Sequence, residues 1–196
     1  MIVAIRHGKV WNPQGLVYAR LPGFRLGDAG RMEVEGLARS LARAPVVAVG
    51  SSPLERAVET ATILARPHGL PVGVDERLLE WSFWVRWQGM PWSVIRGRDP
   101  ELLEAYAKDP AGACPEDPLA DAGGRILRWA GEAEDAHPEG LVLGVTHEAP
   151  LVAALLLGQG RSLGEFHSVN IPHLGAVRLR PGPAEPVDLV AWALTC

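Results

Sequence analysis

Ile2-Val3-Ala4-Ile5-Arg6-His7-Gly8 opens the chain with an apolar run that ends at a guanidinium, an imidazole and a glycine. A short run of this kind predicts a strand buried on both faces, as in a parallel sheet. Ligands of open α/β sheets bind beyond the carboxyl ends of such strands, which is where Arg6 and His7 fall. Taken alone, the triplet Arg-His-Gly favours a surface arginine next to a hydrogen-bonded histidine, so other parts of the chain must decide.

The same pattern, an apolar run followed by a candidate site residue, occurs twice more. Residues 46–50 are apolar and lead into residues 51–61, where Ser52 is expected to cap a helix and Pro53 to take its first position. Arg56 then falls in the first turn, where the helix dipole favours an anion. A third run, 141–146, ends at His147 and continues into an apolar helix over 149–157. If the three strands are parallel, these site residues meet at one edge of the sheet.

The remaining pattern predicts the rest of an α/β fold. Helices are expected over residues 28–44, with Met32, Val34 and Leu37 on the apolar face, and over 100–108 and 121–136. Loops are expected over 13–24, 80–99 and 109–118, and residues 173–180 and 187–194 pair like a hairpin around 181–186. The predicted fold class is a three-layer α/β/α sandwich with a mostly parallel central sheet and an antiparallel edge strand.

Composition indicates one domain and excludes several partners. The chain has 196 residues, of which 47% are hydrophobic and 21% charged, so residues 1–196 are expected to form a single domain. A net charge of −4 argues against nucleic acid as a partner, and no apolar stretch reaches the roughly 18 residues of a membrane span. Cys114 and Cys196 show no CxxC spacing and suit a reducing compartment, so a cytoplasmic location is expected. A homodimer is compatible with the sequence.

Signatures of other reaction types are missing from the sequence. It has no Walker loop, no GxGxxG, no zinc-finger spacing and no GxSxG elbow, and the segment after His147 lacks the second histidine of a metalloprotease helix. We therefore predict neither a metal nor a cofactor.

Four motifs in order make the chain similar to the histidine phosphatase superfamily, also called the phosphoglycerate mutase-like family. Arg6-His7-Gly8 resembles the opening motif, and residues 26–31 resemble its Leu-Thr-x-x-Gly motif. Residues 51–61 resemble the segment Ser-x-Leu-x-Arg-Ala-x-x-Thr-Ala, and Val145-Thr146-His147 resembles the strand that delivers a second histidine. The resemblance covers nearly the whole chain and implies a phosphoglycerate mutase-like fold and a small phosphate ester as substrate.

The resemblance also implies residue roles. His7 is implied to attack the phosphorus of a phosphomonoester, which forms a phosphohistidine that water then hydrolyses. Arg6, Arg56 and His147 are implied to hold the non-bridging oxygens through charge-assisted hydrogen bonds. Asn12 is a further candidate for a phosphate contact, although an Asn-Pro pair equally favours a turn.

Glu80 is implied to be the general acid that protonates the leaving group. Trp81 and Phe83 beside it are expected to desolvate the carboxyl group and raise its pKa. Asp75 and Glu76 are rival acids, and one of them takes the role if Glu80 instead caps a helix or pairs with an arginine.

Several departures from the family pattern bear on the substrate. Glu148 follows the second histidine where glycine is frequent, and its carboxylate is expected to point out of the pocket because it would oppose a phosphate. An aromatic wall for a ring-bearing substrate and plain core packing are equally good interpretations of five tryptophans: Trp11, Trp81, Trp84, Trp87 and Trp92. The other histidines are expected to be structural or exposed: His68, His137, His167 and His173.

Three functions are compatible with these residues. The first is a cofactor-independent phosphomonoesterase, which the shortness of the chain favours over the second, a phosphoglycerate mutase that returns the phosphoryl group to bound product. Isomerisation of 3-phosphoglycerate, measured against release of free phosphate, separates the two. The third is a non-catalytic phosphate-binding module, in which a Trp-rich loop recognises a partner and Glu148 prevents turnover.

Overall fold

The computed structural model describes residues 1–195, and Cys196 lies outside the described residues. Its strands are β1 (Ile2–Arg6), β2 (Val46–Ser51), β3 (Val72–Val74), β4 (Leu141–Thr146), β5 (Ala176–Arg180) and β6 (Glu185–Val187). Its α-helices are α1 (Asp28–Ser40), α2 (Glu55–Ala65), α3 (Trp92–Arg98), α4 (Pro100–Lys108), α5 (Leu119–Ala136), α6 (Glu148–Gly158) and α7 (Leu189–Ala193). Shorter 3-10 helices lie at 66–68, 76–78, 82–87 and 163–168.

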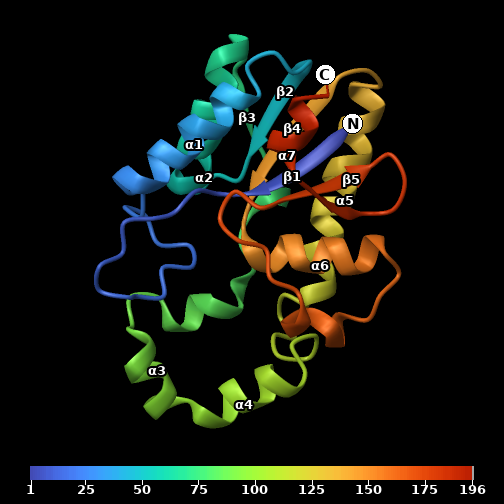
Figure 1. Cartoon of the computed structure of the whole chain (residues 1–196). Coiled ribbons are helices and arrows are strands. Elements are labelled where there is room, and N and C mark those ends of the chain that lie inside the picture. Colours follow the sequence, from blue (N-terminus) through green and yellow to red (C-terminus); the bar gives the residue numbers. More distant parts are fainter. Residues whose placement is uncertain (196) are drawn as a thin grey trace.

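One mixed sheet joins all the described strands in the order β3-β2-β4-β1-β5-β6 (Figure 1). β1 to β4 run parallel to one another, whereas β5 is antiparallel to β1 and β6 is antiparallel to β5. The expected three-layer sandwich is confirmed. β3 was not predicted, because it is a short strand whose residues are mostly exposed and therefore carry little hydrophobic pattern.

Each face of the sheet has its own hydrophobic core. Val3 and Ile5 pack on one side with residues of α1 and α2, whereas Ile2 and Ala4 pack on the other with residues of α5 and α6. Successive side chains of a strand point to opposite faces, so a strand between two helical layers must be apolar at every position. This explains the unbroken apolar run that opens the chain.

Two of the predicted elements differ in the structure. α1 ends at Ser40 rather than at residue 44, and Met32 is 65% exposed although it was expected on the apolar face. The buried face is set by Val34 and Leu37, and Met32 lies two residues, about 200°, from Val34. Residues 187–194 do not form one strand: after β6 the Asp188 carboxylate accepts hydrogen bonds from two backbone N–H groups and starts α7.

The segment 80–99, expected to be an irregular loop, is largely helical. Phe83 and Trp87, four residues apart, are both buried within the 82–87 helical turns, and the indole of Trp87 donates a 2.6 Å hydrogen bond to Asp99. Together with α3 and α4 this segment forms an arc beyond the carboxyl ends of the parallel strands (Figure 1, green). Among the described residues, no helix combines the length and apolar character that crossing a bilayer requires.

Candidate active site

The carboxyl ends of three neighbouring strands bring the site residues together, as predicted. Arg6 at the end of β1 is in register with Thr146 at the end of β4, and the backbone N–H of His7 donates to the Thr146 carbonyl at 3.0 Å. On the other side of β4, the N–H of Ser52 donates to the Val145 carbonyl at 2.9 Å. The chain then turns from each strand end into the space beyond the sheet.

His7 is buried and its ring is fixed at both nitrogens. Nδ1 lies 2.8 Å from the Gly8 carbonyl oxygen, and Nε2 lies 3.1 Å from the Nε of Arg56. Because an arginine can only donate, Nε2 must be the acceptor, and the ring proton must sit on Nδ1 and bind the Gly8 carbonyl. Burial first, and then the Arg56 charge, hold the pKa of His7 well below its usual value. The ring is therefore neutral, and its Nε2 carries no proton and uses its lone pair to accept from Arg56.

His147 is also buried and neutral, but as the opposite tautomer. Its Nδ1 lies 3.2 Å from Nη2 of Arg56 and must accept, so Nε2 carries the proton and donates to the Ser52 hydroxyl at 2.8 Å. Burial, followed by the Arg56 charge, holds the pKa of His147 well below its usual value. The centroids of the His7 and His147 rings are 5.1 Å apart.

Arg56 is the link between the two imidazoles. Its side chain is buried, donates to the Ala19 carbonyl at 2.7 Å, and lies 4.7 Å from the centre of the Tyr18 ring. It occupies the first turn of α2 as predicted, but Ser52 does not cap that helix. The helix begins three residues later, at Glu55, and the Ser52 hydroxyl instead binds His147.

Arg6 reaches the site from the other side and is held by a carboxylate. Its Nη1 donates to the Ile171 carbonyl at 2.7 Å, and its Nη2 forms a 2.9 Å ion pair with Oε2 of Glu148. The prediction that Glu148 points out of the pocket is therefore wrong. Glu148 is the first residue of α6, directly after β4, and Arg6 ends the adjacent strand, so the two side chains are close enough to pair.

Glu80 lies beside these groups with its side chain 13% exposed. Its Oε2 is 3.9 Å from Nδ1 of His147, its Oε1 accepts from the Trp81 N–H at 2.9 Å, and its backbone carbonyl is held by Arg20. Burial is the dominant effect and raises the pKa of Glu80 to about 6, against the opposing charge of Arg56.

The rival acids lie elsewhere. Asp75 pairs with Arg77 at 2.7 Å, and hydrogen bonds from that arginine hold the pKa of Asp75 below its usual value. Glu76 is exposed. Neither residue lines the cavity that contains His7. The geometry therefore favours Glu80 over both.

Asn12 lines the cavity, but its amide is engaged in a turn. Its Oδ1 accepts from the Leu16 N–H at 3.0 Å, and its Nδ2 donates to the Leu16 carbonyl at 2.8 Å. Of the two interpretations of this residue, the turn is the one that the contacts support.

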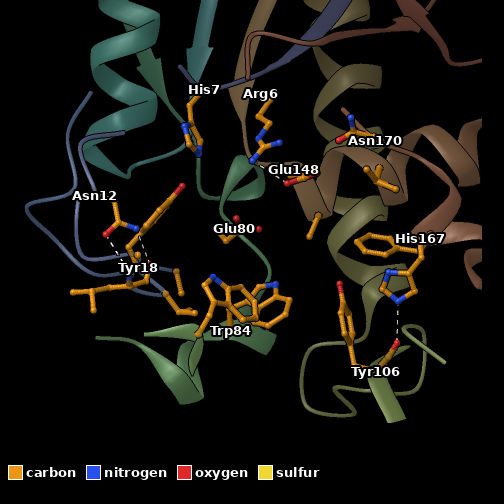
Figure 2. Close-up of a pocket in the computed structure, with 18 of the residues that line it drawn as sticks. Arg6, His7, Asn12, Tyr18, Glu80, Trp84, Tyr106, Glu148, His167 and Asn170 are labelled. Carbon is orange, nitrogen blue, oxygen red and sulfur yellow. Dashed lines mark hydrogen bonds and ion pairs between the residues drawn. The ribbon is translucent and has the colours of Figure 1, made fainter. Parts of the chain in front are cut away.

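A cavity of about 540 Å³ connects His7 and Arg6 with an aromatic region (Figure 2). Trp84 and Trp92 line it, whereas Trp81 and Trp87 are buried beneath and Trp11 is 70% exposed and not among the lining residues. The aromatic-wall interpretation thus applies to two of the five tryptophans, and core packing to two others. Among the described residues, no group of three His, Cys, Asp or Glu side chains is placed to hold a metal ion.

The sequence analysis missed several residues of the site. Tyr18, Tyr106 and Asn170 line the cavity, as does His167, whose Nε2 contacts the Tyr106 carbonyl at 3.0 Å. The ring centroid of His173 is 5.7 Å from that of His7, and burial lowers the pKa of His173 to about 4. His167 is exposed as expected but also lines the cavity, and the half-buried His173 lies beside His7. The pairing of β5 with β1 was the available signal for His173, because His173 precedes β5 by only a few residues.

Comparisons with known proteins found a matching family profile, similar sequences and similar folds. The profile of the Histidine phosphatase superfamily (branch 1) matches residues 2–194. Uncharacterized protein Rv0525 of Mycobacterium tuberculosis is 32% identical over 159 residues, which are 81% of this chain and 78% of that protein. Phosphoserine phosphatase 1 of Hydrogenobacter thermophilus is 27% identical over 170 residues, 85% of this chain and 80% of that protein. Among solved structures, a mycobacterial glucosyl-3-phosphoglycerate phosphatase in complex with VO3 aligns with a TM-score of 0.78 at 24% identity, covering 90% of each chain.

Proposed function

The chain belongs to the histidine phosphatase superfamily, and from this premise we propose that it hydrolyses a small phosphomonoester through a phosphohistidine formed on His7. The observation that carries the proposal is the state of His7. Its Nδ1 proton is engaged by the Gly8 carbonyl, and the lone pair of its Nε2 is directed at the Arg56 guanidinium, a group that can bind a phosphate oxygen. The nucleophilic atom therefore lies next to the place where a phosphoryl group would sit.

In the first step Nε2 of His7 forms a bond to phosphorus while the bond from phosphorus to the leaving oxygen breaks. Arg56 exchanges its two imidazole acceptors for phosphate oxygens, and Arg6 contributes a second positive charge. His147 takes up a proton from solvent on Nδ1 as the dianion binds, because the dianion favours that protonation, and then donates this proton in a hydrogen bond to the phosphate. Glu80, protonated because its pKa is raised, gives its proton to the leaving alkoxide.

In the second step water attacks phosphorus and the bond to Nε2 breaks. Glu80, now a carboxylate, accepts the proton of the attacking water, and His147 returns its extra proton to solvent as the product phosphate leaves, which restores the starting state of the enzyme. The protein's contribution is position and charge, because the transferred phosphoryl group requires little further covalent chemistry.

The experiment is phosphate release from p-nitrophenyl phosphate by the wild type and by His7→Ala, together with detection of an acid-labile phosphoprotein after rapid quenching. We expect His7→Ala to lose turnover and labelling. His137→Ala, which removes a histidine outside the cavity, serves as the control and should keep both. Turnover without a labelled protein, or labelling that persists in His7→Ala, would contradict the proposal.

A second candidate, a non-catalytic phosphate-binding module, is favoured by one observation. The Glu148 carboxylate occupies Nη2 of Arg6, so a phosphate must compete with it for that guanidinium. This candidate predicts that no small ester releases phosphate, and the experiment above separates it from hydrolysis.

A further inference from the structure

The cavity has two ends with different chemistry. Arg6 and His7 lie at one end, and Trp84 and Tyr106 lie at the other, with Glu80 between them and Glu148 directed toward Arg6 (Figure 2). A phosphoryl group bound at His7 would leave the alcohol part of the ester in the aromatic end. The volume of about 540 Å³ is larger than a phosphate needs, so the lining of this end selects the alcohol.

The positive charges around the cavity are all engaged when a phosphate is bound. Of the described Lys, Arg, Asp and Glu side chains that line it, Arg6 is the one cation, and Glu80 and Glu148 are the carboxylates. Arg56 adds a positive charge from behind His7. With Glu80 protonated and His147 protonated as in the first step, two guanidiniums and one imidazolium are fully used by the dianionic phosphate and the Glu148 carboxylate, so none of these positive charges is left for a carboxylate on the alcohol.

The aromatic end has a feature that favours a cation. The rings of Trp84 and Trp92 are 5.1 Å apart between centroids, and those of Trp84 and Tyr106 are 5.2 Å apart. Tyr106 stacks on the buried Phe83 at 4.7 Å, which supports the wall from behind. The faces of such rings attract ammonium groups, and aromatic walls next to a carboxylate recognise amines.

We propose that the substrate is a phosphomonoester whose alcohol carries a protonated amine and no carboxylate, with Glu148 as the residue that selects the amine. The proposal rests on the phosphatase function proposed above. A carboxylate on the alcohol would meet Glu148 and Glu80, and Arg6, the one guanidinium among the described lining residues, is already engaged by the phosphate and by Glu148. Phosphoserine and 3-phosphoglycerate are therefore expected to be poor substrates.

Three esters that differ by one group each provide the test. Ethyl phosphate has a neutral alcohol, O-phosphoethanolamine adds the ammonium, and O-phosphoserine adds a carboxylate to that. We expect kcat/KM of the wild type to be at least tenfold higher for O-phosphoethanolamine than for either of the others. Glu148→Gln should reduce the preference for O-phosphoethanolamine over ethyl phosphate by about tenfold. Glu148→Gln also removes the ion pair with Arg6, but this change affects both esters equally because they carry the same phosphate. It therefore cancels in the ratio of their kcat/KM values.

Glu139→Gln removes the same charge from an exposed position outside the cavity and should leave the ratio unchanged. Equal or better hydrolysis of O-phosphoserine by the wild type, or a ratio that Glu148→Gln does not alter, would overturn this inference while leaving the phosphatase proposal in place. If the wild type released no phosphate from p-nitrophenyl phosphate either, the phosphatase function would be refuted, and the amine preference with it.

Discussion

At the scale of single residues, the site depends on one guanidinium that fixes two imidazoles in opposite tautomers. Arg56 donates to Nε2 of His7 and to Nδ1 of His147, and each ring places its own proton on the remaining nitrogen. The ring nitrogen that faces Arg56 carries no proton in either histidine, so each ring accepts a hydrogen bond from Arg56 without first losing a proton. The same unprotonated Nε2 allows His7 to attack a phosphorus atom. A lysine could not replace this fork, because it carries a point charge without the planar geometry.

Glu80 leads to a prediction about pH and leaving group. Because its pKa is about 6 and its protonated form is the proton donor, kcat/KM for an alkyl phosphate should fall as pH rises above 6. Glu80→Gln should lose this dependence and be slower by about 100-fold or more toward alkyl phosphates. Toward p-nitrophenyl phosphate it should be much less affected, because p-nitrophenolate leaves without a proton.

The measurement is a pH profile of kcat/KM for both esters, with Glu76→Gln as a control. Glu76 is an exposed neighbour of the same charge and was a rival for this role, so its loss should leave both profiles unchanged. Equal slowing of both esters in Glu80→Gln would remove Glu80 from the acid role.

At the scale of elements, the contact between α1 and the segment after β1 depends on one glycine of a family motif. A Cβ on Gly30 would collide with the backbone of Lys9, and the Gly27 N–H donates to the Lys9 carbonyl at 3.0 Å. The close approach holds the segment that follows His7. Gly36, on the same helix, has open space around it and only a distant arginine side-chain atom nearby.

Gly30→Ala and Gly36→Ala are therefore expected to have opposite effects. Gly36→Ala should stabilise the protein by up to about 1 kcal/mol, because alanine is the better helix former. Gly30→Ala should destabilise it by about 1–3 kcal/mol and reduce phosphatase activity, since relief of the clash must move backbone next to His7. Urea unfolding and turnover of p-nitrophenyl phosphate give both quantities. A stabilising effect at both positions would contradict the proposed role of the contact.

Some features of the elements and the site were predictable from the sequence, and others were not. Arg6, His7 and His147 were predictable as neighbours because strand ends in a parallel sheet share an edge, and that rule needs no side-chain detail. The direction of Glu148 was not predictable, because it depends on an ion pair across two strands. The helix over 100–108 was predicted, but the helical turns over 82–98 were missed: the aromatic residues there are buried against one another and against α4, so their spacing alone does not reveal a core.

At the scale of the whole molecule, one sheet forms part of both hydrophobic cores and positions the site residues. The two hydrophobic clusters lie on opposite faces of the same strands, and the buried site residues lie where those strands end. Unfolding of the sheet would therefore also release the buried imidazoles. That residues 1–196 form a single domain stays a prediction of the sequence analysis.

The buried imidazoles link folding to pH, which gives a last prediction. His7 and His147 have pKa values well below 6.5 in the folded protein, whereas the unfolded chain protonates both below about pH 6.5. The unfolded state then binds more protons, so the free energy of unfolding must decrease as pH falls below 6.5, by about 1.4 kcal/mol per pH unit for each proton. Glu80 acts in the opposite direction below pH 6, because its raised pKa lets the folded state hold a proton that the unfolded state has lost.

Urea unfolding between pH 5 and 8 should therefore show a free energy of unfolding that begins to decrease near pH 6.5 as pH falls, with a shallower slope below pH 6. His147→Gln should reduce the dependence by one proton and His137→Gln, outside the site, should not; identical slopes in the wild type and His147→Gln would mean that this histidine is not held neutral by the fold.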